Sequence, residues 1–137
     1  IPVIINPMDN IPNSFDELSS SLELASVLNQ AGITIMFDSA RSHNYHLMRQ
    51  GAGNAVAYGM KYEDAISGMS KIVADVFGIK NRGSLVKGNF ADVVIWESDP
   101  LEPASMPLYV IIEGEQIDLI TRSSRLKDRY INKLIKN

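Results

Sequence analysis

Three things are missing from this 137-residue sequence, namely cysteine, long apolar runs and an excess of positive charge. Without cysteine there are no disulfides, thiolate zinc sites or cysteine nucleophiles. No apolar run approaches the roughly 18 to 20 residues that a membrane-spanning helix needs, so no membrane partner is expected. The net charge is −3, which leaves no basic surface for nucleic acid. These absences predict a soluble globular protein, with cytoplasm and periplasm both open as its compartment.

Two common catalytic signatures are also missing. Ser42 and His43 are neighbours in the sequence, but no glycine-serine-glycine nucleophile elbow surrounds them, so serine catalysis is not expected. The segment "GAGNA" at residues 51–55 lacks the spacing of a dinucleotide-binding loop and does not directly follow a predicted strand. A phosphate-binding loop is therefore not expected either.

The first 44 residues have the pattern of a parallel α/β unit. Apolar runs at 2–5 and 33–37 predict two buried strands, and the segment 14–31 between them predicts a helix. A strand, a helix and a second strand in this order favour parallel pairing, with ligands at the carboxyl ends of the strands. Those ends are residues 6–10 and 38–44.

The helix at 14–31 is predicted from its start signal and its apolar face. Ser14 and Glu17 match a capping box, and Gly32 stands where a left-handed residue often ends a helix. The apolar residues at helical spacing are Phe15, Leu18, Leu22, Ala25 and Leu28.

In the rest of the chain, the amino-acid pattern changes at residue 79. Before it, Gly51 and Gly53 indicate a helix that another backbone approaches closely, and a single helix is predicted over 62–77, ended by Gly78. After it, turn residues alternate with β-formers, which predicts a small antiparallel unit over 79–120. Within it, "KGNFADVVIW" at 87–96 is interpreted as a hairpin in which Asp92 binds the backbone of its own turn. An amphipathic helix is predicted over 123–137.

The candidates for chemistry cluster after the second predicted strand. Asp38 stands at its carboxyl end, where a carboxylate can bind a metal or accept a proton, although it can equally cap the next turn. His43 and His46 are three residues apart, as some metal pairs are, but a hydrogen-bonded loop histidine and a surface one fit the same spacing. Arg41 and Arg49 are able to bind a carboxylate in bidentate fashion, whereas arginines in loops are usually solvated.

Several segments of the chain form a pattern that is known from one enzyme family. They are "GSLVKGNFADVVIW" with "DPLEP" after it, and upstream "AGNAVAYGM", "YEDAI", "VFGI", "NSFDEL", "AGITIMF" and "SHN". With these segments the chain resembles the amidohydrolase superfamily, in particular its imidazolonepropionase-like members. These segments are colinear with the family pattern and cover nearly the whole chain.

This resemblance implies an α/β fold made of the last two β/α units of a TIM-like metal-dependent hydrolase barrel. The C-terminal strands of a small β-sandwich and a terminal helix would follow. The implied division is residues 1–78 for the partial barrel, 79–120 for the sandwich strands and 121–137 for the helix. The implied activity is cleavage of a carbon-nitrogen bond in a small-molecule substrate by metal-activated water, with zinc first among the divalent metals.

The resemblance also implies roles for particular residues. Anchored on residues 42–44, the position of the family's aspartate after the eighth strand falls on Arg41, while Asp38 lies three residues earlier. If the register slips, Asp38 is the catalytic base and a metal ligand; if it does not, this ligand is lacking. Arg41, His43 and Asn44 are the expected substrate-binding residues.

The other metal ligands of the family have no counterpart in this sequence, so the chain alone is expected to bind no metal and to be inactive. As part of a barrel with unpaired strand edges, it is expected to self-associate or swap elements. The alternative is an autonomous, non-catalytic α/β binding or assembly module.

Overall fold

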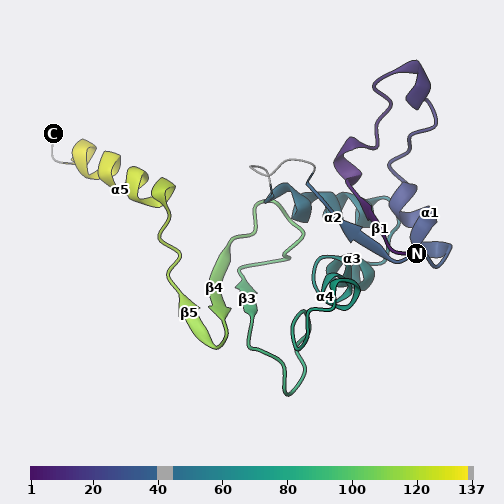
Figure 1. The fold of residues 1–137 in the computed structure, drawn as a ribbon. Coiled ribbons are helices and arrows are strands. Elements are labelled where there is room, and N and C mark those ends of the chain that lie inside the picture. Colours follow the sequence, from purple (N-terminus) through teal and green to yellow (C-terminus); the bar gives the residue numbers. More distant parts are fainter. Residues whose placement is uncertain (40–44, 136–137) are drawn as a thin grey trace.

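The computed structural model describes residues 1–39 and 45–135 and shows a mixed α/β fold (Figure 1). Strands β1 (Val3–Ile5) and β2 (Ile35–Phe37) pair in parallel, with Val3 opposite Ile35 and Ile5 opposite Phe37. The predicted parallel pairing of these two strands is confirmed, with a helix between them that is shorter than predicted. Both strands are shorter than their apolar runs.

The core is built around β2, whose three residues are all buried. Helices α2 (Leu47–Ala57) and α3 (Tyr62–Gly68) pack on this strand. The close backbone approach expected in α2 is confirmed at Gly53, where a Cβ would lie 2.9 Å from the carbonyl oxygen of Leu101, whereas the neighbour of Gly51 is a proline ring. A Cβ at Gly51 would lie 3.3 Å from Cδ of Pro7, in the 3₁₀ turn η1 (Pro7–Asp9) that follows β1. In contrast, Ile4 of β1 is 53% exposed, so the prediction that this strand is buried was wrong.

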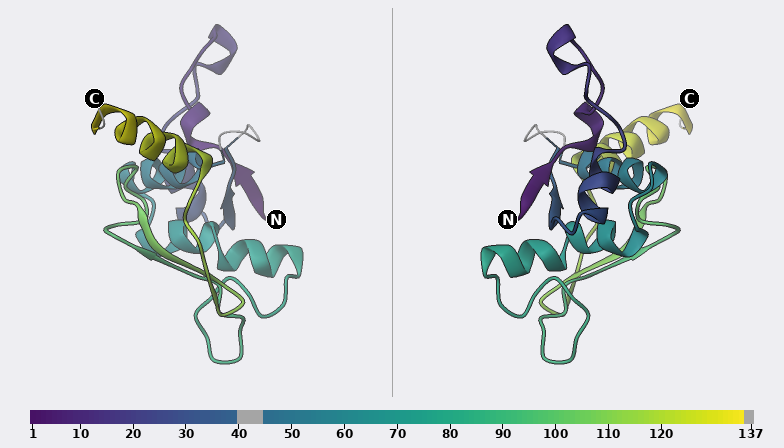
Figure 2. Two further views of the ribbon diagram at one scale, coloured as in Figure 1. Left: turned by 90° about the vertical axis from the view of Figure 1, so that its left-hand side faces the viewer. Right: turned by 90° about the vertical axis from the view of Figure 1, so that its right-hand side faces the viewer.

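The helix predicted at 14–31 is largely absent. The structure has only a 3₁₀ turn η2 (Phe15–Glu17) and a short helix α1 (Leu24–Gln30). No capping box forms, because the Ser14 side chain makes no cap hydrogen bond and the Glu17 carboxylate accepts from the N–H of Asn13 at 3.0 Å. Phe15 is 90% exposed, so the first part of the expected apolar face has no core to pack against. This arm projects away from the body of the molecule (Figure 2).

The single helix predicted over 62–77 is two helices, α3 and α4 (Lys71–Phe77). The break falls at Ser70, whose backbone is non-helical at φ −137° and ψ −86°. Its hydroxyl donates to the carbonyl oxygen of Ile66 at 2.9 Å, the kind of local bond with which serine competes against a helix. The predicted end at Gly78 is confirmed, since this residue is left-handed at φ 68°.

The second half contains the predicted antiparallel sheet, in the order β3 (Val93–Trp96), β4 (Pro107–Ile112) and β5 (Glu115–Ile117). Helix α5 (Arg122–Ile135) follows and extends to one side of the molecule (Figure 1). Among the described residues, no helix is both long and apolar enough to cross a membrane.

The hairpin interpretation of residues 87–96 was wrong in its pairing. Strand β3 pairs with β4, which lies after it in the chain, and not with a strand before the Gly88 turn. Asp92 binds a different turn, because its carboxylate accepts from the N–H of Glu113 at 2.9 Å. Arg82 forms ion pairs with both Asp92 and Glu113, so these three residues join the loop after α4 to the turn between β4 and β5.

Candidate functional site

The carboxyl ends of β1 and β2, where the sequence predicts a site, lie at the same edge of the parallel pair. The N–H of Asp38 donates to the carbonyl oxygen of Ile5 at 2.9 Å, so the parallel ladder continues one residue past β2. Since parallel strands bring their carboxyl ends to one edge, this bond holds Asp38 beside the segment that follows β1.

The segment after β1 is organised by Asn6, which uses both ends of its side chain. Its oxygen accepts from the N–H of Met8 at 3.1 Å and its nitrogen donates to the Asp9 carboxylate at 2.7 Å. Pro7 is buried against α2 at Gly51. These contacts hold the turn, which presents a second carboxylate, that of Asp9, on the β1 side.

Asp38 is exposed, and one oxygen of its carboxylate accepts from the N–H of Ser39 at 2.7 Å. It makes no ion pair within residues 1–39 and 45–135. Over the same residues, no three carboxylate, histidine or cysteine side chains come close enough to hold a metal ion. The described residues thus fit the role of one metal ligand, supplied by the end of a strand, but they do not form a complete centre.

The other predicted site residues lie in the segment after Asp38. Arg41, His43 and Asn44 are outside the described residues, so their roles remain predictions. His46 is described; it precedes α2 on the exposed surface, with its ring edge-on to that of Tyr45 at 6.2 Å between centroids. The metal pair of His43 and His46 also remains a prediction.

The model of the amidohydrolase family matches residues 6–119. The chain belongs to the amidohydrolase family. The match includes both strand ends of the candidate site and the whole sheet of the second half, which agrees with the resemblance found in the sequence.

Individual relatives of the amidohydrolase chain share only parts of their length with it. Amidohydrolase tasK of Hapsidospora irregularis is 36% identical over 64 residues, which is 46% of this chain and 6% of that protein. The crystal structure of an amidohydrolase from Thermotoga maritima MSB8 matches with a TM-score of 0.73 and 24% identity, over 86% of this chain and 31% of that one. A second amidohydrolase crystal structure gives a TM-score of 0.61 and 18% identity, over 77% and 28%. The chain therefore spans less than a third of each of these relatives.

Arg49 of the amidohydrolase chain is neither a solvated loop residue nor free to bind a substrate. Its guanidinium donates to backbone carbonyl oxygens of the loop between β3 and β4 at 2.9 to 3.3 Å and lies 4.5 Å from the ring centroid of Trp96. The four acceptors belong to Pro100, Glu102, Pro103 and Ser105. The hypothesis that Arg49 binds a carboxylate was wrong; it joins α2 to the second half.

Asn10, which lies just after the η1 turn, was not among the predicted site residues. Its side-chain nitrogen is buried and has no hydrogen-bond partner within the described part of the chain. A buried donor without a partner is costly, so this position stands out at the same end of the strands as Asp38. The only sequence signal was its place within residues 6–10.

Perturbed pKa values occur away from the strand ends, at one contact between α3 and the loop after β3 and at one cluster within the second half. Burial, and next a hydrogen bond to Asp99, raises the pKa of Tyr62. The N–H of Glu113, and then Arg82, lower the pKa of the Asp92 carboxyl. These shifts reflect contacts that hold the fold together rather than chemistry at the candidate site.

Proposed function

We propose that this chain is a C-terminal part of a metal-dependent amidohydrolase, which hydrolyses carbon-nitrogen bonds of a small-molecule substrate. The proposal places β1, α1, β2 and α2 in the last two β/α units of a (β/α)₈ barrel, followed by strands of a second, composite domain. The observation that carries it is a carboxylate, Asp38, at the carboxyl end of a buried parallel strand, within a chain that matches the family over residues 6–119.

The metal of this proposal is a divalent ion, zinc first, which would act as a Lewis acid and lower the pKa of a bound water. Asp38 is the residue of this chain that would ligate it or accept a proton from the water. Its exposed carboxylate keeps its place through the hydrogen bonds of its own N–H to Ile5 and of Ser39 to its oxygen. The remaining ligands would come from protein outside this chain, so the isolated chain would have no turnover.

The residues that follow Asp38 are proposed to bind the substrate. Arg41 would pair with an anionic group, and His43 and Asn44 would donate or accept hydrogen bonds at its polar atoms. All three follow directly on the strand end, which is where parallel α/β folds place their ligands.

The first test is the coding sequence upstream of Ile1. A reading frame that continues upstream and encodes a histidine-x-histidine pair is expected. A start codon directly before Ile1 would instead favour the autonomous, non-catalytic binding or assembly module.

The second test is made in the longer protein, where Asp38→Asn is compared with Asp9→Asn. Asp38→Asn is expected to lower the zinc content measured by mass spectrometry, and to reduce hydrolysis of an amide panel at least 100-fold. Asp9 lies at the same edge, but its carboxylate already accepts a hydrogen bond from Asn6. The Asp9→Asn variant should therefore retain the metal. Equal zinc content and activity in the Asp38→Asn variant would contradict the role of this residue.

A further inference from the structure

The last residue of α3, Gly68, faces the strand β2. It is buried, and its backbone φ is not positive, so the backbone conformation at this position does not require glycine. Glycine is also less favourable than alanine inside a helix. The reason for a glycine at this position therefore lies in the space around it.

The space next to Gly68 is filled by β2. A Cβ on Gly68 would lie 2.9 Å from the carbonyl oxygen of Ile35, and 3.0 and 3.3 Å from two ring carbons of Phe37. Since non-bonded carbon atoms pack at about 3.5 to 4.0 Å, an alanine here would force α3 and β2 apart by about 0.5 Å.

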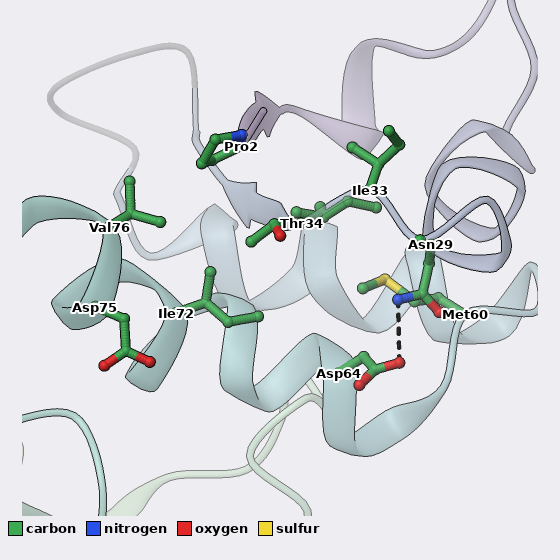
Figure 3. Close-up of a pocket in the computed structure, with 11 residues that line it drawn as sticks. Pro2, Asn29, Ile33, Thr34, Met60, Asp64, Ile72, Asp75 and Val76 are labelled. Atoms are coloured by element: carbon green, nitrogen blue, oxygen red, sulfur yellow. Dashed lines mark hydrogen bonds between the residues drawn. The ribbon is translucent and has the colours of Figure 1, made fainter.

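Helix α3 is held by other elements, so the displacement falls on β2. Asn29 of α1 donates to the Asp64 carboxylate at 3.0 Å, as Figure 3 shows. The hydroxyl of Tyr62 donates to the Asp99 carboxylate at 2.9 Å. These two hydrogen bonds tie α3 to α1 and to the loop between β3 and β4, and neither involves β2.

Asp38 directly follows Phe37, at the end of the strand that Gly68 contacts. Its N–H donates to the carbonyl oxygen of Ile5 at 2.9 Å, so the position of its backbone depends on how β2 lies against β1. Metal-ligand distances are kept within about 0.2 Å, and catalytic groups within about 0.5 Å of their productive positions. The displacement expected from an added Cβ is large on this scale.

We propose that Gly68 is a positioning residue for Asp38. Because Gly68 has no side chain, α3 seats β2 closely, and this contact fixes the strand end that carries the Asp38 carboxylate. Both partners of the contact belong to this chain, and Gly68 acts only through β2. The inference rests on the proposed function, in which Asp38 is a metal ligand.

Gly53 of α2 provides a matched control. Its φ is not positive either, and a Cβ there would also lie 2.9 Å from a carbonyl oxygen, that of Leu101. Leu101 belongs to the loop between β3 and β4 and not to β2. Gly53→Ala therefore introduces the same crowding without acting on the strand that carries Asp38.

The test compares the longer protein with its Gly68→Ala and Gly53→Ala variants. Gly68→Ala is expected to raise the zinc dissociation constant roughly tenfold and to lower kcat at saturating zinc by a similar factor, since a misplaced group costs rate even when the metal is bound. Gly53→Ala should leave both quantities within about threefold of the wild type, because it does not move the strand end.

A spectroscopic measurement separates positioning from loss of folding. In cobalt-substituted protein, the visible absorption bands report the ligand geometry of those molecules that hold the metal. Gly68→Ala should shift these bands, and Gly53→Ala should not. Urea denaturation verifies that each variant is folded under the assay conditions. If Gly68→Ala does not fold, Phe37→Leu alters the same contact from the strand side and should shift the bands as well.

The outcomes distinguish this inference from the function on which it rests. If Asp38→Asn lowers the zinc content but Gly68→Ala binds zinc and hydrolyses as Gly53→Ala does, only the positioning role is overturned. Equal losses in Gly68→Ala and Gly53→Ala would also overturn it, because they would show a general effect of crowding. If Asp38→Asn retains zinc and activity, the metal role of Asp38 is refuted and the positioning role with it.

Discussion

The two halves of the molecule are held together by different forces. Among the described residues, nine of the ten buried core side chains precede residue 79, and the only one after it is Leu101. The second half instead relies on the Arg82 ion pairs and on the Arg49 contacts with the loop between β3 and β4. The parallel unit is thus stabilised by burial, and the antiparallel sheet by polar contacts with little core of its own.

The largest effect on stability is expected from Phe37→Ala in β2. The side chain is 6% exposed and lies against Gly68 of α3, so its removal should cost about 3 to 5 kcal/mol through lost burial and a cavity. Urea denaturation measures the change. Phe15→Ala is the matched control, since Phe15 is 90% exposed, and should shift stability by less than about 0.5 kcal/mol. If the two substitutions lowered the unfolding free energy equally, burial around β2 would not be what stabilises the parallel unit.

A smaller, local effect is expected from Arg49→Ala. Hydrogen bonds to a charged group are worth about 1.5 to 3 kcal/mol each at most when buried, and Arg49 is only partly buried. The loss of unfolding free energy in Arg49→Ala should therefore stay at about 1.5 kcal/mol. Hydrogen exchange should accelerate at residues 97–106 and stay unchanged in β2. Arg49→Lys keeps the charge but not the planar fork, and should resemble the alanine variant. Faster exchange throughout both halves would contradict a local clamp.

The next effect depends on pH and concerns Asp92. Its pKa is lowered in the folded state by the Glu113 N–H and by Arg82. The stabilisation is therefore present above the unfolded pKa of about 3.9 and is lost as the pH falls below it towards the folded value. Urea midpoints should differ between wild type and Asp92→Asn at pH 6, and converge below about pH 4. The matched control is Asp16→Asn, at an exposed position, which should leave the urea midpoint unchanged at pH 6. A difference between wild type and Asp92→Asn that stays constant with pH would refute this linkage.

The smallest effect on the stability of the monomer is expected in α5. Leu134 is 78% exposed, so Leu134→Ala should change the unfolding free energy by less than about 0.5 kcal/mol at concentrations where the chain is monomeric. A larger loss in dilute solution would show that α5 packs on its own molecule.

The sequence predicted those parts of the fold that local patterns determine. The two apolar, β-branched runs predicted the parallel pair of strands. The alternation of turn residues with β-formers predicted the antiparallel sheet. The position of Asp38 at the end of β2 followed from the same reasoning, because a strand end is fixed by the residues of the strand itself.

The errors arose where distant contacts decided the outcome. The apolar residues at Phe15 and Leu18 have helical spacing but no surface to cover, so they do not form a helix. Arg49 contacts residues more than fifty positions away in the sequence, and no local sequence pattern predicts such a contact. The break at Ser70 is accompanied by a hydrogen bond from its hydroxyl to the carbonyl oxygen of Ile66. The helical spacing of the apolar residues does not predict this bond.

The central claim is that Asp38 is one ligand of a metal centre whose other ligands lie outside this chain. The most direct measurement is chelator-sensitive hydrolysis of an amide panel by the purified 137-residue chain with added zinc. No turnover above the buffer rate is predicted. Hydrolysis that disappears with chelator and in Asp38→Asn would contradict the claim, because it would mean that this chain holds a complete centre by itself.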